Sequence, residues 1–279
     1  MTTATRLNFP IRGDKLSMSV EVRSQIARLQ TPFQTIEIVD TPVLGTLLLL
    51  DGHIQLSTLD EHAYHESLVQ IPMATLPEAR RALVVGGGDG GALRELCRHS
   101  GLETIDLVEI DRGVIDLCRR HMPELSAGAF DDPRVAVHCE DAFGFMKLPR
   151  ELYDLIVLDV TDVYEGEDGA LSERLFTGEF HDACARALAP GGLLVTQADN
   201  LVFCPYSLEA ILDILRGVFP KTGAYQALVP SFGGYSGFAW AGHRRQLSSQ
   251  CPGSLDGLRY LTPTTWALAF EPLPFMARG

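Results

Sequence analysis

The feature that most restricts the fold is a regular alternation of strand-like and helix-like segments from residue 82 onward. Short apolar runs give way to stretches with the helical period. The pattern predicts strands at 82–85, 104–108, 135–139, 155–158 and 193–197, and helices at 91–98, 114–121, 142–148, 178–188 and 206–219. Repeated strand–helix units form parallel sheets with helices on both faces. We therefore predict an α/β fold with a doubly wound, Rossmann-like sheet, with two more strands between residues 224 and 241.

The first 60 residues follow a different pattern. Residues 18–27 and 33–39 alternate polar and apolar side chains, and residues 46–50 run into Asp51-Gly52, a hairpin-turn signal, before 53–57. This indicates a small N-terminal antiparallel β domain over 1–60, ahead of a larger domain over 61–279.

Two segments of the larger domain lie outside the strand–helix alternation. Residues 61–73 read as a helix that ends near Pro72, because proline disrupts helix interiors. The tail after Leu247 has no clear period and is expected to be irregular.

Charge and composition argue against several classes of protein. The net charge of −13 argues against binding to nucleic acid or to an anionic membrane surface. No apolar run approaches the length of about 20 residues that spans a bilayer, and no signal-peptide pattern is visible at the N-terminus. The six cysteines form no C-x-x-C pair, which is typical of reduced structural thiols. We therefore expect a cytoplasmic protein.

Residues 84–94, Val-Val-Gly-Gly-Gly-Asp-Gly-Gly-Ala-Leu-Arg, place a carboxylate inside a glycine-rich turn. Glycines such as Gly86 and Gly88 let the backbone approach a nucleotide or nucleoside. A loop built for a dinucleotide presents a helix N-terminus to the phosphate groups. The carboxylate of Asp89 would repel those phosphates. The turn therefore indicates a nucleoside ligand with a cationic group beside Asp89, and it disfavours a dinucleotide oxidoreductase.

Acidic residues also follow the next two predicted strands. Glu109 comes about 20 residues after the glycine turn, where a carboxylate can bind both hydroxyls of a ribose. Asp111 fits better as a helix N-cap. Asp141 and the backbone of Ala142 can bind the amine and a ring nitrogen of adenine, although Asp141 alone would be an ordinary N-cap.

Asp159 and Asp162 follow the fourth predicted strand, at the sheet edge where α/β proteins bind ligands. One carboxylate can hold an ammonium, and the other can accept a proton from an amine about to act as nucleophile. The alternative is that both residues only cap loops.

The helix that starts near residue 61 carries His62, Tyr64, His65 and Glu66. The spacing matches no familiar zinc signature, and no third ligand stands out in the sequence, so no metal is predicted. We expect Tyr64 to offer a π face and His65 a hydrogen bond to an alkylammonium substrate.

In combination, these segments resemble the spermidine synthases and the wider polyamine aminopropyltransferase family. The resemblance extends over nearly the whole chain, and its most specific parts are the Gly-Gly-Gly-Asp-Gly-Gly turn, Tyr64-His65-Glu66 and the Asp-x-x-Asp pair. It implies a sheet of the S-adenosylmethionine methyltransferase type. It also implies transfer of the aminopropyl group of decarboxylated S-adenosylmethionine to an amine, with release of 5′-methylthioadenosine and without a prosthetic group or metal.

The resemblance also implies roles for particular residues. Those that would hold the methylthioadenosyl part are Gln34, Glu109, Asp141 and Ala142, with Gly86 and Gly88 in the turn. Asp89 would hold the aminopropyl ammonium, and Asp159 would be the base. Those that would place the amine acceptor are Tyr64, His65, Asp162 and Gln197. The family forms dimers or tetramers, so a homodimer or homotetramer is expected.

Several positions depart from the family pattern and leave the acceptor open between putrescine and a longer polyamine such as spermidine. Residues 163–169 form a longer, more acidic loop, Phe232 stands where a tyrosine usually contacts putrescine, and Trp266 replaces a typical histidine. The stretch before Phe232 resembles thermospermine-type synthases. Two alternatives remain: an S-adenosylmethionine-dependent methyltransferase on the same fold, and a non-catalytic polyamine- or nucleoside-binding protein.

Overall fold

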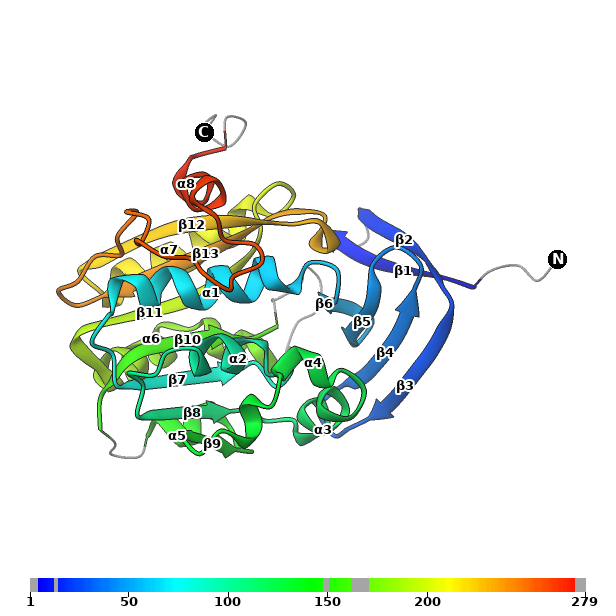
Figure 1. The fold of residues 1–279 in the computed structure, drawn as a ribbon, viewed down its shortest axis with the longest axis horizontal. Helices are drawn as coiled ribbons and strands as arrows, with labels where there is room; N and C mark the ends of the chain where they lie inside the picture. Colours follow the sequence, from blue (N-terminus) through cyan, green and yellow to red (C-terminus); the bar gives the residue numbers. More distant parts are fainter. Residues whose placement is uncertain (1–4, 13–14, 148–150, 162–170, 274–279) are drawn as a thin grey trace.

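The computed structural model describes residues 5–12, 15–147, 151–161 and 171–273 (Figure 1). The N-terminal part of these residues forms a two-stranded and a four-stranded antiparallel sheet. Its strands are β1 (Thr5–Arg12), β2 (Leu16–Val22), β3 (Ser24–Gln30), β4 (Thr35–Thr41), β5 (Gly45–Leu50) and β6 (His53–Ser57). β1 pairs with β2, and β3 to β6 follow one another in sequence order.

Two details of this part differ from the prediction. The strand predicted over 18–27 is divided at Arg23, where the chain leaves one sheet and enters the other. Three consecutive polar residues, Arg23-Ser24-Gln25, interrupt the alternation at this point, but apolar residues resume at Ile26, so the pattern still predicts one strand. β1 was not predicted, because its alternation is interrupted by Pro10.

The central sheet has seven strands in the described part of the chain, in the order β12-β13-β11-β10-β7-β8-β9. They are β7 (Arg81–Gly86), β8 (Thr104–Val108), β9 (Val135–His138), β10 (Tyr153–Asp159), β11 (Leu188–Asn200), β12 (Lys221–Val229) and β13 (Gly234–Gly242). β7 to β11 are parallel to one another, whereas β13 is antiparallel to both β11 and β12. The predicted doubly wound α/β sheet is therefore confirmed, with an antiparallel hairpin at one edge.

Helices cover both faces of this sheet (Figure 1). One face carries α1 (Glu61–Thr75), α2 (Gly91–Cys97) and α8 (Pro263–Phe270), and the other carries α5 (Ala142–Met146), α6 (Gly178–Ala187) and α7 (Pro205–Val218). Successive side chains of a strand point to opposite faces. Accordingly, Ala82 and Val84 of β7 belong to the first core, and Leu83 and Val85 to the second.

Two expectations for the helices were wrong. α1 does not end near Pro72 but continues to Thr75. The packing of its buried residues against the sheet stabilises the helix by more than the loss of one backbone hydrogen bond at proline costs. The tail is not wholly irregular, since α8 forms after a capping box made by Thr262 and Thr265. That helix is short and largely apolar, so it has no clear polar face to reveal its period.

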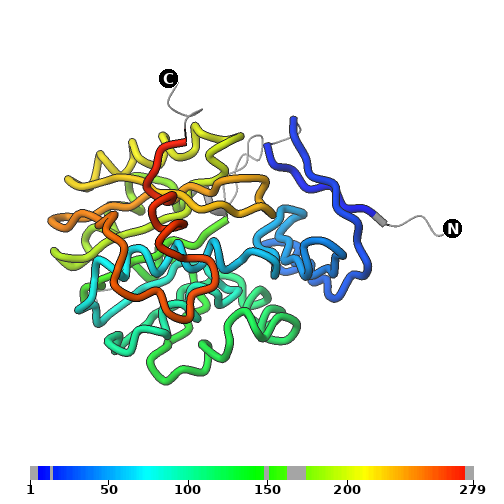
Figure 2. Tube along the Cα trace, turned by 45° about the horizontal axis from the view of Figure 1, so that its top comes forward, coloured from blue at the N-terminus to red at the C-terminus, as the bar shows by residue number. Residues whose placement is uncertain are grey.

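The small N-terminal sheet faces the carboxyl ends of the parallel strands. α3 (Arg112–His121) and the short α4 (Pro123–Ser126) follow β8. They pack against the four-stranded N-terminal sheet through a shared core that includes Ile36, Leu48 and Val114. Figure 2 shows this sheet set to one side of the central one. The strand ends are thus partly covered, which leaves a cavity between the two parts. In the described residues, no helix combines the length and apolarity needed to cross a membrane.

Candidate active site

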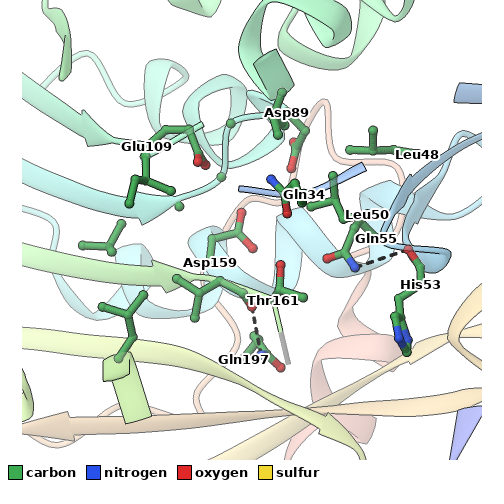
Figure 3. A pocket seen from close by; sticks show the side chains of 18 of the residues that line it. Gln34, Leu48, Leu50, His53, Gln55, Asp89, Glu109, Asp159, Thr161 and Gln197 are labelled. Carbon is green, nitrogen blue, oxygen red and sulfur yellow. Dashed lines mark hydrogen bonds between the residues drawn. The ribbon is translucent and has the colours of Figure 1, made fainter. Parts of the chain in front are cut away.

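A cavity of about 630 Å³ lies between the ends of the parallel strands and the N-terminal sheet (Figure 3). It is lined from the N-terminal side by Gln34, Leu48, Leu50, His53 and Gln55, and from the central sheet by Gly86, Gly88, Asp89, Glu109, Asp141, Ala142, Asp159 and Gln197. Tyr64, His65 and Phe232 also line it. The structure therefore brings together every predicted site residue that it describes.

The glycine turn lets two strand ends approach each other closely. Gly86 has a φ of +78°, and a Cβ there would lie 2.1 Å from the carbonyl oxygen of Asp159. At Gly88 a Cβ would lie 2.9 Å from the side chain of Glu109. A side chain at Gly86 would therefore displace Asp159, and one at Gly88 would displace Glu109.

Asp89 is held by the turn and by a histidine from α1. Its Oδ1 accepts a hydrogen bond of 2.7 Å from the backbone N–H of Gly91 and lies 3.3 Å from Nε2 of His65. Burial alone would raise the pKa of Asp89, but the charge and hydrogen bond of His65 outweigh it and lower the pKa. Asp89 therefore stays ionised, ready to face a cation.

Asp159 ends β10 and lies close to Asp89, but its pKa is shifted in the opposite direction. Tyr64 donates a hydrogen bond of 2.7 Å to its Oδ1, while its Oδ2 is buried and has no hydrogen-bond partner among the described residues. Burial, and then the negative charge of Asp89, raise the pKa of Asp159 to about 6. A carboxylate with one uncommitted oxygen and a raised pKa is suited to accept a proton.

His65 does not point its ring nitrogens into open pocket. Nδ1 lies 2.7 Å from Oε2 of Glu61, and Nε2 faces Asp89. Burial would lower the pKa of His65, but the neighbouring charges and hydrogen bonds of Asp89 and Glu61 raise it to about 10. The expected hydrogen bond between His65 and a substrate ammonium stays a prediction. An ammonium can only donate, so the bond would need an unprotonated ring nitrogen, whereas both nitrogens face carboxylates here.

The other end of the cavity has the features expected of a nucleoside site. Glu109 is buried, and its Oε1 accepts a hydrogen bond of 2.8 Å from the N–H of Asp111. Burial raises the pKa of Glu109 to about 7. Asp111 caps α3, as predicted, by accepting a hydrogen bond from Gly113. It also accepts hydrogen bonds from Gln34 at 3.0 Å and from Thr31 at 2.7 Å, so the N-terminal sheet is tied to this end of the cavity.

Asp141 caps α5 by accepting a hydrogen bond of 3.0 Å from Phe143, and Ala142 is buried beside it. Arg174, which the sequence analysis did not single out, lies 3.5 Å from Oδ2 of Asp141. Its guanidinium also lies 4.8 Å from the centre of the Phe143 ring. No signal in the sequence could have suggested this, since nothing near Arg174 marks a ligand site.

At the remaining side of the cavity, Gln197 is fixed by its neighbours. Its Nε2 donates to the carbonyl of Val160 at 3.0 Å, and its Oε1 accepts from the N–H of Asp199 at 2.9 Å. The ring of Phe232 meets that of Tyr64 edge-on, with centroids 5.8 Å apart. Asp162 and the acidic loop 163–169 lie outside the described residues.

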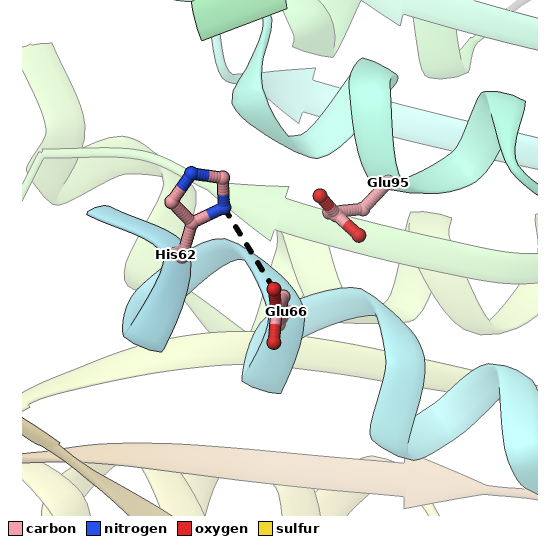
Figure 4. Close-up of side chains that lie close together, drawn as sticks. All are labelled: His62, Glu66 and Glu95. Atoms are coloured by element: carbon pink, nitrogen blue, oxygen red, sulfur yellow. Dashed lines mark ion pairs between the residues drawn. The ribbon is translucent and has the colours of Figure 1, made fainter. Parts of the chain in front are cut away.

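His65, Asp89 and Asp159 of the cavity lie close enough together to be possible metal ligands, and a second such group comes together where the sequence suggested no third ligand. His62 and Glu66 of α1 meet Glu95 of α2, with one ligand atom of each within 4.8 Å of the others (Figure 4). The two carboxylates already have partners. Glu66 accepts hydrogen bonds from the N–H groups of residues 259–261, and Glu95 pairs with Arg94 and Arg98 at 2.8 and 2.9 Å. The group therefore ties α1 to α2 and to the C-terminal segment.

The fold and the site define a Rossmann-like α/β protein with a cavity of about 630 Å³, one end of which carries the neighbouring carboxylates Asp89 and Asp159. The chain belongs to the spermine/spermidine synthase family. The model of the spermine/spermidine synthase domain matches residues 61–248, and that of the spermidine synthase tetramerisation domain matches residues 10–58.

Relatives with the name polyamine aminopropyltransferase match most of the chain. The protein of Serratia proteamaculans (strain 568) is 39% identical over 223 residues, 79% of this chain and 75% of the relative. That of Salmonella newport (strain SL254) is 36% identical over 269 residues, 92% of this chain and 91% of the relative.

Two solved structures share the fold along almost its full length. A crystal structure of a spermidine synthase in complex with the transition-state analogue AdoDATO has a TM-score of 0.90 at 26% identity, covering 97% of this chain and 93% of that one. The spermidine synthase of Thermotoga maritima has a TM-score of 0.88, also at 26% identity, covering 97% of this chain and 92% of that one.

Proposed function

We propose that this protein is a polyamine aminopropyltransferase that moves the aminopropyl group of decarboxylated S-adenosylmethionine to an amine acceptor. The observation that carries the proposal is the pair of carboxylates, Asp89 and Asp159, at one end of a nucleoside-sized cavity. One is held ionised by His65, and the other has a raised pKa and an uncommitted oxygen. The ionised carboxylate of Asp89 suits the ammonium of the donor. The carboxylate of Asp159, with its raised pKa, suits an acceptor amine that must lose a proton.

The reaction is a displacement at carbon. The acceptor nitrogen attacks the aminopropyl carbon next to the sulfonium, a C–N bond forms, and the C–S bond breaks. Its electrons go to sulfur, which leaves as the neutral thioether of 5′-methylthioadenosine. Because the sulfonium is already a good leaving group, the main barrier is the proton on the acceptor ammonium. In this scheme Asp159 takes that proton, and orientation of the two substrates supplies much of the remaining acceleration.

The donor would lie along the strand ends. Glu109, with its buried carboxylate, would accept hydrogen bonds from the ribose hydroxyls, and Asp141 with Ala142 would face the adenine. Asp89 would receive the aminopropyl ammonium. Gln34 would help to hold the nucleoside part, although its hydrogen bond to Asp111 shows that it also fixes that cap. The existence of an AdoDATO complex of a spermidine synthase with the same fold supports binding of a donor of this kind.

The acceptor would lie between Tyr64, Gln197 and Phe232. The Phe232 ring packs against Tyr64 and offers no hydroxyl, so Phe232 adds only an apolar surface to this side of the cavity. We leave the acceptor open between putrescine and a longer polyamine such as spermidine. We further propose a division into domains at residues 1–60 and 61–279, and a homo-oligomer, dimer or tetramer, assembled through the N-terminal sheets. The tetramerisation-domain match supports the oligomer.

Product analysis tests the proposal. The protein is incubated with decarboxylated S-adenosylmethionine and, separately, putrescine, spermidine, cadaverine or agmatine. Release of methylthioadenosine together with an aminopropylated amine is expected for at least one acceptor. If no amine gives either product, and S-adenosylmethionine with a methyl acceptor gives S-adenosylhomocysteine, the protein is a methyltransferase and the proposal is wrong.

A further inference from the structure

A chain of four side chains with alternating charge, three of them buried and Asp89 partly buried, leads from α2 to the glycine turn. Arg94 of α2 contacts Glu61 of α1, Glu61 contacts His65 one turn further along α1, and His65 contacts Asp89. α2 itself starts directly after the turn that carries Asp89. The chain of contacts is therefore closed into a ring by the backbone from Asp89 to Arg94.

The geometry of the Arg94 end leaves little freedom. The guanidinium grips Glu61 with two hydrogen bonds of 2.9 Å, from Nη1 to Oε1 and from Nη2 to Oε2. It also donates 2.8 Å hydrogen bonds to Glu95 and to the carbonyl of Leu125. A two-point arginine–carboxylate contact fixes orientation as well as distance. Glu61 is therefore held in one position against α2.

Glu61 in turn fixes the imidazole of His65. Its Oε2 lies 2.7 Å from Nδ1, which directs Nε2 at Oδ1 of Asp89. On the opposite side the ring packs against Gly91, where a Cβ would lie only 2.3 Å from Cε1. The ring is thus confined from both sides. With carboxylates at both nitrogens, the doubly protonated form is the one that satisfies both contacts.

We propose that Glu61 and Arg94 are positioning residues that act through His65 to hold Asp89 where the aminopropyl ammonium binds. This inference rests on the proposed function and adds two residues that do not touch the substrate. If Glu61 is neutralised, His65 loses one of the two carboxylates that hold its proton and its angle. Asp89 then loses its fixed partner, although the ribose and adenine ends of the cavity are unchanged.

The test compares two ligands that differ in the aminopropyl group. Calorimetry gives the Kd of decarboxylated S-adenosylmethionine and of methylthioadenosine for the wild type, Glu61→Gln, Arg94→Gln and Arg94→Lys. We expect Glu61→Gln and Arg94→Gln to weaken donor binding at least tenfold and to leave methylthioadenosine binding within twofold. Arg94→Lys keeps the charge but loses the two-point contact. It should bind the donor more tightly than Arg94→Gln and less tightly than the wild type.

Arg98→Gln is the matched control, because it removes an arginine–carboxylate pair at the end of the same helix without touching Glu61. It should leave both Kd values unchanged. If Glu61→Gln and Arg94→Gln weaken the binding of both ligands equally, or of neither, Glu61 and Arg94 have only a structural role and the inference is wrong.

A second measurement covers variants that fail to fold. In the wild type at pH 8, ¹⁵N NMR should show one imidazole with both nitrogens protonated that is missing from the spectrum of His65→Gln. A neutral His65 ring would overturn the inference. The proposed function has a separate readout: it fails if the wild type releases no methylthioadenosine, whereas the inference alone fails if the wild type is active and the variants bind like Arg98→Gln.

Discussion

The hydroxyl of Tyr64 lies 2.7 Å from Oδ1 of Asp159 and donates a hydrogen bond to it. The residue that we propose as the base is thus oriented by a phenol from α1, while its second oxygen is left for the acceptor. Because this hydrogen bond favours the ionised carboxylate, it lowers a pKa that burial and Asp89 raise. Tyr64 therefore tunes the base as well as placing it.

Replacing Asp159 by asparagine should remove turnover and keep nucleoside binding. The amide has nearly the same shape but cannot take the acceptor proton, so kcat should fall by about 10²–10⁴-fold. Steady-state kinetics and calorimetry with methylthioadenosine check the two halves of this expectation. A variant with undiminished kcat would show that Asp159 is not the base, and loss of methylthioadenosine binding would show that the substitution disturbs the fold of the cavity.

Tyr64→Phe should shift the acid limb of the pH–rate profile upward. Without the phenol hydrogen bond the ionised form of Asp159 is less stable, so its pKa should rise above about 6, by roughly one unit. Tyr225→Phe is the matched control, since the buried Tyr225 hydroxyl donates to the carbonyl of Ser67. It should lower stability without moving the limb. An unchanged limb in Tyr64→Phe contradicts the tuning role.

Two different pH dependences should separate the two ends of the cavity. The raised pKa of Asp159 makes the base protonated, and inactive, below about pH 6, so kcat measured with both substrates saturating should rise with pH through that value. The raised pKa of Glu109 means that the ribose-binding form appears only as pH rises through about 7. Methylthioadenosine affinity should therefore increase across that range in the wild type, and Glu109→Gln should flatten the increase. A flat affinity in the wild type would remove Glu109 from the ribose site.

Gly91→Ala should damage donor binding through His65. The added methyl would lie 2.3 Å from the imidazole, so the ring must move and its contact with Asp89 must change. Overpacking of this kind costs about 1–3 kcal/mol of stability. Gly217→Ala is the control, because nothing lies within 4 Å of a Cβ at this position in α7. It should raise stability by about 0.5–1 kcal/mol. Thermal unfolding and donor calorimetry give both quantities, and equal effects of the two substitutions would contradict this account.

Most strands and helices, and the carboxylates at the carboxyl edge of the sheet, could be predicted because each follows from a local sequence pattern. The glycine turn, Glu109 and Asp159 all follow apolar strands, and parallel strands end at one edge of a sheet. The links between distant segments could not be predicted. Arg94 and Glu61 are 33 residues apart, and Thr31 and Asp111 are 80 apart, so only the folded chain brings them together.

His65 shows the same limit in another form. Its place in the site was expected, but a histidine pattern does not tell whether the ring nitrogens face a substrate or two carboxylates. α8 was missed because a short, apolar helix lacks the polar face that makes a period visible.

The measurement that tests the account most directly is the comparison of two donors by calorimetry. S-adenosylmethionine differs from its decarboxylated form by one carboxylate, which would lie near the ionised Asp89. Like charges in a buried site repel, so the wild type should bind the decarboxylated form at least tenfold more tightly. Asp89→Asn should remove most of that preference. Equal or tighter binding of S-adenosylmethionine by the wild type would contradict the account.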